Sequence, residues 1–260
     1  MLVRRSSPAL LGALAAATVA AGVAAGTLSS QAADGPVTAA APRWADIQAV
    51  DGGYRFRSGG HDNRLTIRLT QRGLRLADRS VEELTSYPSS CEEVAVSRGI
   101  AAVCAVPDDA TAEDPLELEV QSRLGDDLVD ASSLPASVEL SVLADAGADR
   151  VRTGAADDFV NGARGRDRVR GGDGDDWIRT GLGRDRLVGG AGHDRLVGVG
   201  AGDWLDGGSG DDEVGGGPGN DVLHGGPGRD TVRCSTGRDE AFVDAEDVHS
   251  DCEVVAVERT

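Results

Sequence analysis

From Ala144 to Phe242 a single apolar position recurs every nine residues among glycines and polar side chains. The eighth position of each nonapeptide is aliphatic, from Val151 to Ala241, and its neighbours at positions seven and nine are mostly polar. Because side chains alternate across a strand, this pattern predicts three-residue strands at positions seven to nine. Only the eighth side chain of each strand then faces inward.

Glycine and aspartate fill the other recurring positions of these units. Gly is common at positions one, two and four, where it allows tight loops with positive φ. The sixth position is Asp in all eleven consecutive nonapeptides. These aspartates are Asp149, Asp158, Asp167, Asp176, Asp185, Asp194, Asp203, Asp212, Asp221, Asp230 and Asp239.

A nine-residue period of this kind predicts a solenoid, in which two nonapeptides make one flattened coil and stacked coils form parallel sheets about 4.8 Å apart. Every second aspartate then lies above its neighbour, in one row from Asp149 to Asp239 and another from Asp158 to Asp230. Like carboxylates at that separation repel, and a divalent cation between them cancels the repulsion. Carboxylate and carbonyl oxygens in a flexible cage suit Ca²⁺ better than Mg²⁺. The rows contain five and four gaps, so nine ions is the ceiling.

The segments on either side of the array are expected to close its ends. Residues 43–143 alternate between apolar and polar positions, as in Leu65–Leu69, and are predicted as irregular β coils that cap the array, with a small separate β-domain as the alternative. Within them Asp127 resembles the sixth position of one degenerate unit. Residues 243–260 are predicted as a C-terminal cap, since an exposed sheet edge invites aggregation.

The first 32 residues predict export. Arg4 and Arg5 precede the apolar stretch 9–28, and small residues at Ser30 and Ala32 supply a cleavage site, which together predict a secretory signal peptide. An uncleaved anchor is the alternative, and after cleavage no membrane attachment is expected. Export makes disulfides plausible.

Four cysteines allow three connectivities. The pairing of near neighbours is predicted, Cys91 with Cys104 and Cys234 with Cys252.

Charge and composition narrow the function classes. The formal charge of −18 argues against a nucleic-acid partner and favours cations or solubility. Arginines at the seventh position are expected to balance acids along the sheets. Neither HExxH nor GxSxG occurs, and no histidine has an evident nucleophile partner, so no catalytic residue is assigned and the protein is expected not to be an enzyme.

The repeats resemble the repeats-in-toxin (RTX, hemolysin-type) calcium-binding family, whose unit is GGxGxDxUx. The resemblance implies an all-β fold, a right-handed parallel β-roll, with Ca²⁺ in the turns and folding that depends on the ion. It implies the eleven aspartates as metal ligands, together with glycines of the five units that keep Gly at positions one, two and four, namely Gly171, Gly189, Gly207, Gly216 and Gly225. Ala156 and Ala201 replace the fourth Gly, so sites beside them are expected to be weak.

With its signal peptide, cysteine pair and C-terminal cap, the chain also resembles small secreted calcium-binding proteins of high-GC bacteria. The sequence therefore predicts a secreted, extracellular, non-enzymatic calcium-binding protein. Two alternatives are an adhesin with a cell-wall or glycan partner and a secreted hydrolase with a small catalytic part.

Overall fold

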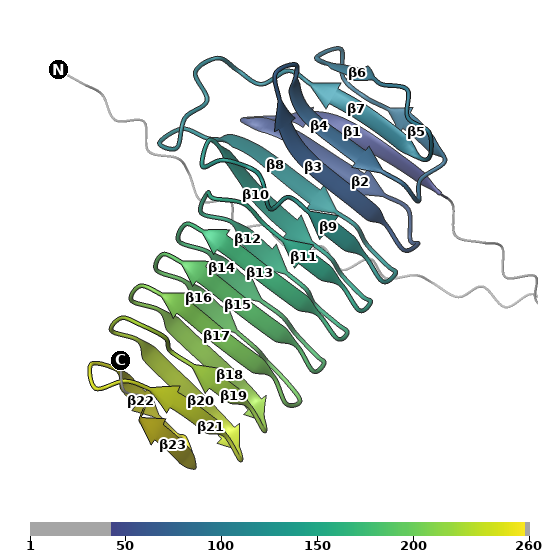
Figure 1. The fold of residues 1–260 in the computed structure, drawn as a ribbon. Coiled ribbons are helices and arrows are strands. Elements are labelled where there is room, and N and C mark those ends of the chain that lie inside the picture. The colour runs from purple at the N-terminus through teal and green to yellow at the C-terminus, as the bar shows by residue number, and fades with distance from the viewer. Residues whose placement is uncertain (1–42, 258–260) are drawn as a thin grey trace, which may run out of the picture. The chain divides into compact units, whose positions relative to one another are not determined.

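The structure, a computed structural model, describes residues 43–257, and all regular elements in that range are β-strands (Figure 1). The predicted signal peptide lies outside this range. No helix in the described part is long and apolar enough to cross a membrane. The first sheet has the order β22 (Val248–Ser250), β20 (Thr231–Gly237), β18 (Glu213–Gly219), β16 (Arg195–Val197), β14 (Trp177–Arg179), β12 (Phe159–Asn161), β10 (Val138–Leu143), β8 (Leu116–Gln121), β2 (Gly53–Ser58), β1 (Trp44–Val50) and β5 (Glu83–Ser86). The second sheet has the order β23 (Val254–Val257), β21 (Glu240–Val243), β19 (Val222–His224), β17 (Trp204–Ser209), β15 (Arg186–Ala191), β13 (Arg168–Asp173), β11 (Arg150–Arg152), β9 (Leu128–Asp130), β3 (Arg64–Thr70), β4 (Gly73–Asp78), β7 (Ile100–Cys104) and β6 (Cys91–Glu93).

Successive strands of the repeat alternate between the two sheets. Within a sheet each strand pairs in parallel with the strand one coil later, so that Val160 is opposite Ile178 and Ile178 is opposite Leu196. The predicted coil of two nonapeptides is therefore confirmed. The repeat is an all-β solenoid of stacked parallel strands, as expected of a β-roll (Figure 1).

The interior of the repeat is one aliphatic side chain thick on each side. The eighth-position residues point between the sheets, and Ile178, Leu187, Leu196 and Leu205 are fully buried. Their neighbours at positions seven and nine face outward, as the alternation of a strand requires. Each half-coil thus buries one apolar side chain, and the rest of its inward surface is glycine backbone and aspartate.

Antiparallel hairpins occupy the segment where the sequence predicts irregular β coils. Strand β1 pairs with β2, and β3 pairs with β4, which in turn pairs with β7. Tight reversals at Gly52 and Gly73, with φ of +85° and +128°, make these hairpins possible. Because β2 pairs in parallel with β8 and β3 with β9, the hairpins continue the same two sheets.

The C-terminal segment adds one more coil. Strand β22 pairs in parallel with β20, and β23 pairs with β21. Disulfides join Cys234 to Cys252 and Cys91 to Cys104, so the predicted pairing is confirmed. The first of these bonds fastens the last coil to the end of the repeat.

Candidate metal sites at the turns of the coils

The structure places the eleven sixth-position aspartates in two rows along the turns that precede the strands. In each row the main-chain N–H of one Asp donates to Oδ1 of the Asp one coil later. Asp176 donates to Asp194 at 2.9 Å, and Asp194 donates to Asp212 at 2.7 Å. All eleven side chains are at most 4% exposed. The first row contains Asp149, Asp167, Asp185, Asp203, Asp221 and Asp239, and the second contains Asp158, Asp176, Asp194, Asp212 and Asp230.

The second carboxylate oxygen of most of these residues is buried without a hydrogen-bond partner. An orphaned carboxylate oxygen is costly in a protein interior, because burial removes the water that would otherwise solvate it. The residues whose Oδ2 has no partner are Asp149, Asp167, Asp176, Asp185, Asp194, Asp212, Asp221, Asp230 and Asp239.

Asp158 and Asp203 differ from the other nine. The Oδ2 of Asp158 accepts a hydrogen bond from the N–H of Gly154 at 2.9 Å, and that of Asp203 accepts one from Val199 at 3.3 Å. Both belong to the units in which Ala156 or Ala201 replaces the fourth glycine. In the two units that lack the fourth glycine, both oxygens of the aspartate therefore accept hydrogen bonds from the chain.

A first-position glycine lies close to the orphaned oxygen of six of these nine aspartates, namely Asp167, Asp176, Asp194, Asp212, Asp221 and Asp230. A methyl group placed on Gly189 would lie less than 3.0 Å from both Asp194 Oδ2 and the carbonyl oxygen of Gly207, one coil later. The same pair of oxygens, a carboxylate and a first-position carbonyl, adjoins Gly171 and Gly207. A side chain at these glycines would crowd the carboxylate, which gives a geometric reason for glycine there, although Ala144, Thr180 and Cys234 hold the first position in three other units with an orphaned oxygen.

Thr153 shows what happens when a side chain occupies the first position of a unit. Its hydroxyl donates a 2.6 Å hydrogen bond to the carbonyl oxygen of Gly171. The hydroxyl also lowers the pKa of Asp158, although burial keeps that pKa raised, at about 6. The turn at Asp158 is thus satisfied by the protein's own groups.

Burial and mutual repulsion make the metal-free rows unfavourable for charged carboxylates. Burial raises the pKa of Asp176 to about 8, against the lowering effect of the Asp158 N–H, and the carboxylates of Asp158 and Asp194 raise it further. Burial likewise raises the pKa of Asp149 to about 8 and that of Asp212 to about 7. Near neutral pH these carboxylates therefore favour a bound proton or a bound cation over a bare charge.

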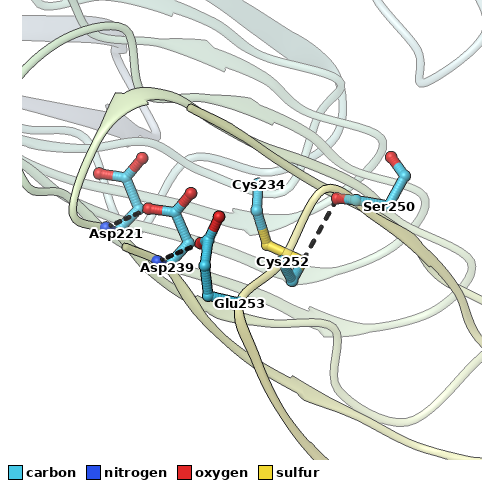
Figure 2. The surroundings of a disulfide bond; sticks show 6 residues. All are labelled: Asp221, Cys234, Asp239, Ser250, Cys252 and Glu253. Carbon is cyan, nitrogen blue, oxygen red and sulfur yellow. Dashed lines mark hydrogen bonds between the residues drawn. A yellow bond between two sulfur atoms is a disulfide. The ribbon is translucent and has the colours of Figure 1, made fainter. Parts of the chain in front are cut away.

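Three residues that the sequence did not single out complete the rows. The N–H of Asp230 donates to Asp247 at 2.8 Å, and the N–H of Asp239 donates to Glu253 at 2.8 Å (Figure 2). At the other end the N–H of Asn63 donates to Asp127 at 2.7 Å, and Asp127 donates to Asp149 at 2.8 Å. Figure 2 shows Glu253 next to Cys252, so the disulfide to Cys234 fixes the residue that ends the first row.

The donors of these turns are of the kind that Ca²⁺ prefers. Beside Gly171, Gly189 and Gly207 the turns offer a carboxylate oxygen and the carbonyl oxygen of a glycine one coil later, both hard oxygen donors. Within residues 43–257 no three His, Cys, Asp or Glu side chains converge as a ready-made metal site. Main-chain carbonyls would therefore have to supply the remaining ligands.

The comparison with protein-family models matches the RTX calcium-binding nonapeptide repeat at residues 141–169, 162–196 and 197–232. The array belongs to the RTX repeat family. The matched residues lie within β10 to β20, which contain most of both aspartate rows. The RTX repeats and the solenoid fold together fit a calcium-binding β-roll. No curated protein and no solved structure matches the chain.

Proposed function

We propose that the protein is a secreted, non-enzymatic calcium-binding β-roll protein whose RTX array folds when Ca²⁺ binds. The observation that carries this proposal is the set of nine buried Asp Oδ2 atoms without a hydrogen-bond partner. Each of these atoms belongs to a row in which the next aspartate lies one coil away. A divalent cation in these gaps would supply the missing partner and cancel the repulsion between the carboxylates.

The thin core supports the coupling of folding to Ca²⁺. One aliphatic side chain per half-coil buries little apolar surface against the entropy of ordering nine residues. The buried carboxylates add a further cost when they are charged. Ca²⁺ that binds only the folded turns stabilises them by mass action. At neutral pH without Ca²⁺ the array would remain expanded.

Secretion is supported by the predicted signal peptide and by the two disulfides, which persist in oxidising compartments. In this proposal residues 43–143 and 243–260 are caps of the array. The eleven aspartates and the glycines Gly171, Gly189, Gly207, Gly216 and Gly225 line the ion sites. The sites beside Asp158 and Asp203 would be the weakest, because their Oδ2 atoms already accept hydrogen bonds.

Far-UV circular dichroism of the mature chain tests the proposal. The protein is titrated from chelator into millimolar Ca²⁺, with Mg²⁺ as the control. A cooperative gain of β signal with Ca²⁺ alone is expected. A β spectrum that chelator leaves unchanged would show that the coils stack without metal, and the aspartate rows would then be structural.

A further inference from the structure

The outward side of the second sheet carries a cluster of five arginines, here called the arginine face. The strand register places Arg150, Arg168 and Arg186 in line at the seventh position, and Arg152 and Arg170 in line at the ninth. All five side chains are exposed. Five guanidinium groups on adjacent strands stand out in a chain whose formal charge is −18.

The arginines of the two sheets differ in their ion-pair partners. On the first sheet Glu213 lies between Arg195 and Arg233 and contacts both. On the arginine face no ion pair within residues 43–257 includes Arg150, Arg152, Arg168 or Arg170. At the β9 end of the face, Asp130 forms its ion pair with Arg68 at 3.0 Å.

Like charges directly opposite each other on neighbouring strands destabilise a sheet. Arg150, Arg152, Arg168 and Arg170 therefore carry positive charge that no ion pair among residues 43–257 neutralises. An anionic ligand with several charged groups along its length would remove this repulsion.

An aromatic surface continues the same sheet beyond the arginines. The guanidinium group of Arg186 lies over the ring of Trp204, 3.9 Å from its centroid. The ring of His224 follows at 5.3 Å, and Phe242 stacks on His224 at 4.3 Å. Because these rings contact one another and Arg186, they present half-buried apolar edges along the sheet, while the neighbouring arginines bind anions in a planar, bidentate way.

We propose that the arginine face and its aromatic extension bind a linear acidic polysaccharide. The carboxylate or sulfate groups of the chain pair with the arginines along a shallow hollow of about 360 Å³, lined also by Leu128 and Val188. Sugar rings lie against the apolar edges of Trp204 and its aromatic neighbours. The proposal requires the stacked coils and so rests on the folded array, but it does not require that Ca²⁺ cause the folding. It extends the proposed function by naming a surface and a class of partner.

Isothermal titration calorimetry of the full mature chain in saturating Ca²⁺ tests this proposal. The probes are short heparin fragments for sulfate and short oligogalacturonate for carboxylate, because long polyuronate chains would be cross-linked by Ca²⁺. A neutral dextran fragment and a single-stranded oligonucleotide of similar length are the comparisons. Binding of at least one acidic fragment is expected, weakening as salt is added. Dextran is expected not to bind.

The double variant R168Q/R170Q removes the centre of the face and is expected to weaken binding by about tenfold or more. The matched control is R195Q/R233Q on the opposite sheet, which removes the same charge and should leave affinity within about twofold. Replacing Trp204 with Leu should lower the affinity for the acidic fragments without abolishing binding, because the arginines remain.

Three results would overturn the proposal: no binding of either acidic fragment to the folded wild type, equal losses in the two double variants, or an oligonucleotide that binds as tightly as the sugars. Circular dichroism of each variant in the same buffer reports the fold separately. A chain that is folded with and without Ca²⁺ would contradict the proposed function and leave the binding test valid. Should R168Q/R170Q fail to fold, the wild-type binding and the single variant R168Q decide the matter.

Discussion

The main-chain N–H of Asp176 donates to Oδ1 of Asp194, one coil later, and Oδ2 of Asp194 is buried with no hydrogen-bond partner. One oxygen of the carboxylate thus accepts a hydrogen bond that links two coils. The other oxygen has no hydrogen-bond donor. This division of roles within one side chain recurs along both rows. The role of an individual aspartate can therefore be tested by substitution.

Replacing Asp194 with Asn keeps the size of the side chain and an oxygen for the N–H of Asp176, but removes the charge. We expect the Ca²⁺ concentration at the folding midpoint to rise by roughly tenfold, since affinity depends on the charge of the ligands. Asp175→Asn is the matched variant, because it removes the same charge from an exposed side chain and keeps an oxygen for the N–H of His193. Its midpoint should change much less. Equal shifts in the two titrations would argue against an ion at Asp194.

Replacing Gly189 with Ala puts a methyl group against Asp194 Oδ2 and the carbonyl oxygen of Gly207. Overpacking of this kind costs about 1–3 kcal/mol, and the same methyl group would exclude an ion. The melting temperature in saturating Ca²⁺ is expected to fall. Gly215→Ala is the control, because its nearest neighbour, the carbonyl oxygen of Leu196, would be 3.7 Å away in ordinary contact. Similar melting temperatures for both variants would contradict the crowded geometry.

The pH dependence of the metal-free chain follows from the raised pKa values. Burial raises the pKa of Asp176 from 3.8 to about 8, so the folded coils bind more protons than the unfolded chain across this range. Stability of the metal-free array is therefore greatest below pH 4 and is lost as the pH rises to 8. Circular dichroism in metal-stripped buffer should show more β signal at pH 5 than at pH 8.

Protons and Ca²⁺ compete for the same carboxylates, so the affinity for Ca²⁺ is expected to increase with pH. The midpoint of the Ca²⁺ titration should move to lower concentration between pH 6 and pH 8.

A metal-free chain whose β signal increases with pH would contradict the first of these two predictions. It would show that the aspartates are charged and otherwise compensated in the folded coils.

Removing the disulfide at the end of the array should loosen its last coil. Cys234 and Cys252 are separated by 18 residues, and a loop of this size contributes roughly 3 kcal/mol in the chain-entropy model. The double variant C234S/C252S is expected to melt at a lower temperature and to exchange the amide of Asp239 faster, because Glu253 is no longer held. Hydrogen exchange read by mass spectrometry distinguishes this from C91S/C104S, which should affect the N-terminal hairpins instead.

The regular part of the fold was predictable because the period is exact over eleven units. Eighth-position residues such as Ile178 and sixth-position residues such as Asp176 recur at fixed spacing, and that spacing alone determines which side chains lie above one another. The orphaned oxygens could not be predicted in the same way. Whether Asp158 Oδ2 has a partner depends on the N–H of Gly154, which is a contact and not a spacing.

The ends of the rows were missed because the spacing changes there. Asp247 follows Asp230 by 17 residues and Glu253 follows Asp239 by 14, so a search in steps of nine does not find them. Asn63 is separated from Asp127 by 64 residues, because the hairpins and β8 are inserted between them. One signal was present: Asn63 precedes Leu65 by two residues, as each Asp precedes its aliphatic residue. Alternation predicted strands in residues 43–143 but not their antiparallel partners, which depend on contacts between distant strands.

The hydrogen bonds that join one row aspartate to the next all point in one direction, from the amide of an earlier coil to the carboxylate of a later one. The two ends of the stack are therefore not equivalent. Among these carboxylate bonds, loss of the first coil frees acceptors, whereas loss of the last leaves the amides of Asp230 and Asp239 without a carboxylate. A chain that emerges with its N-terminus first exposes amides whose acceptors have not yet been made. Along the two carboxylate rows, the last amides therefore find their acceptors only when Asp247 and Glu253 have been made.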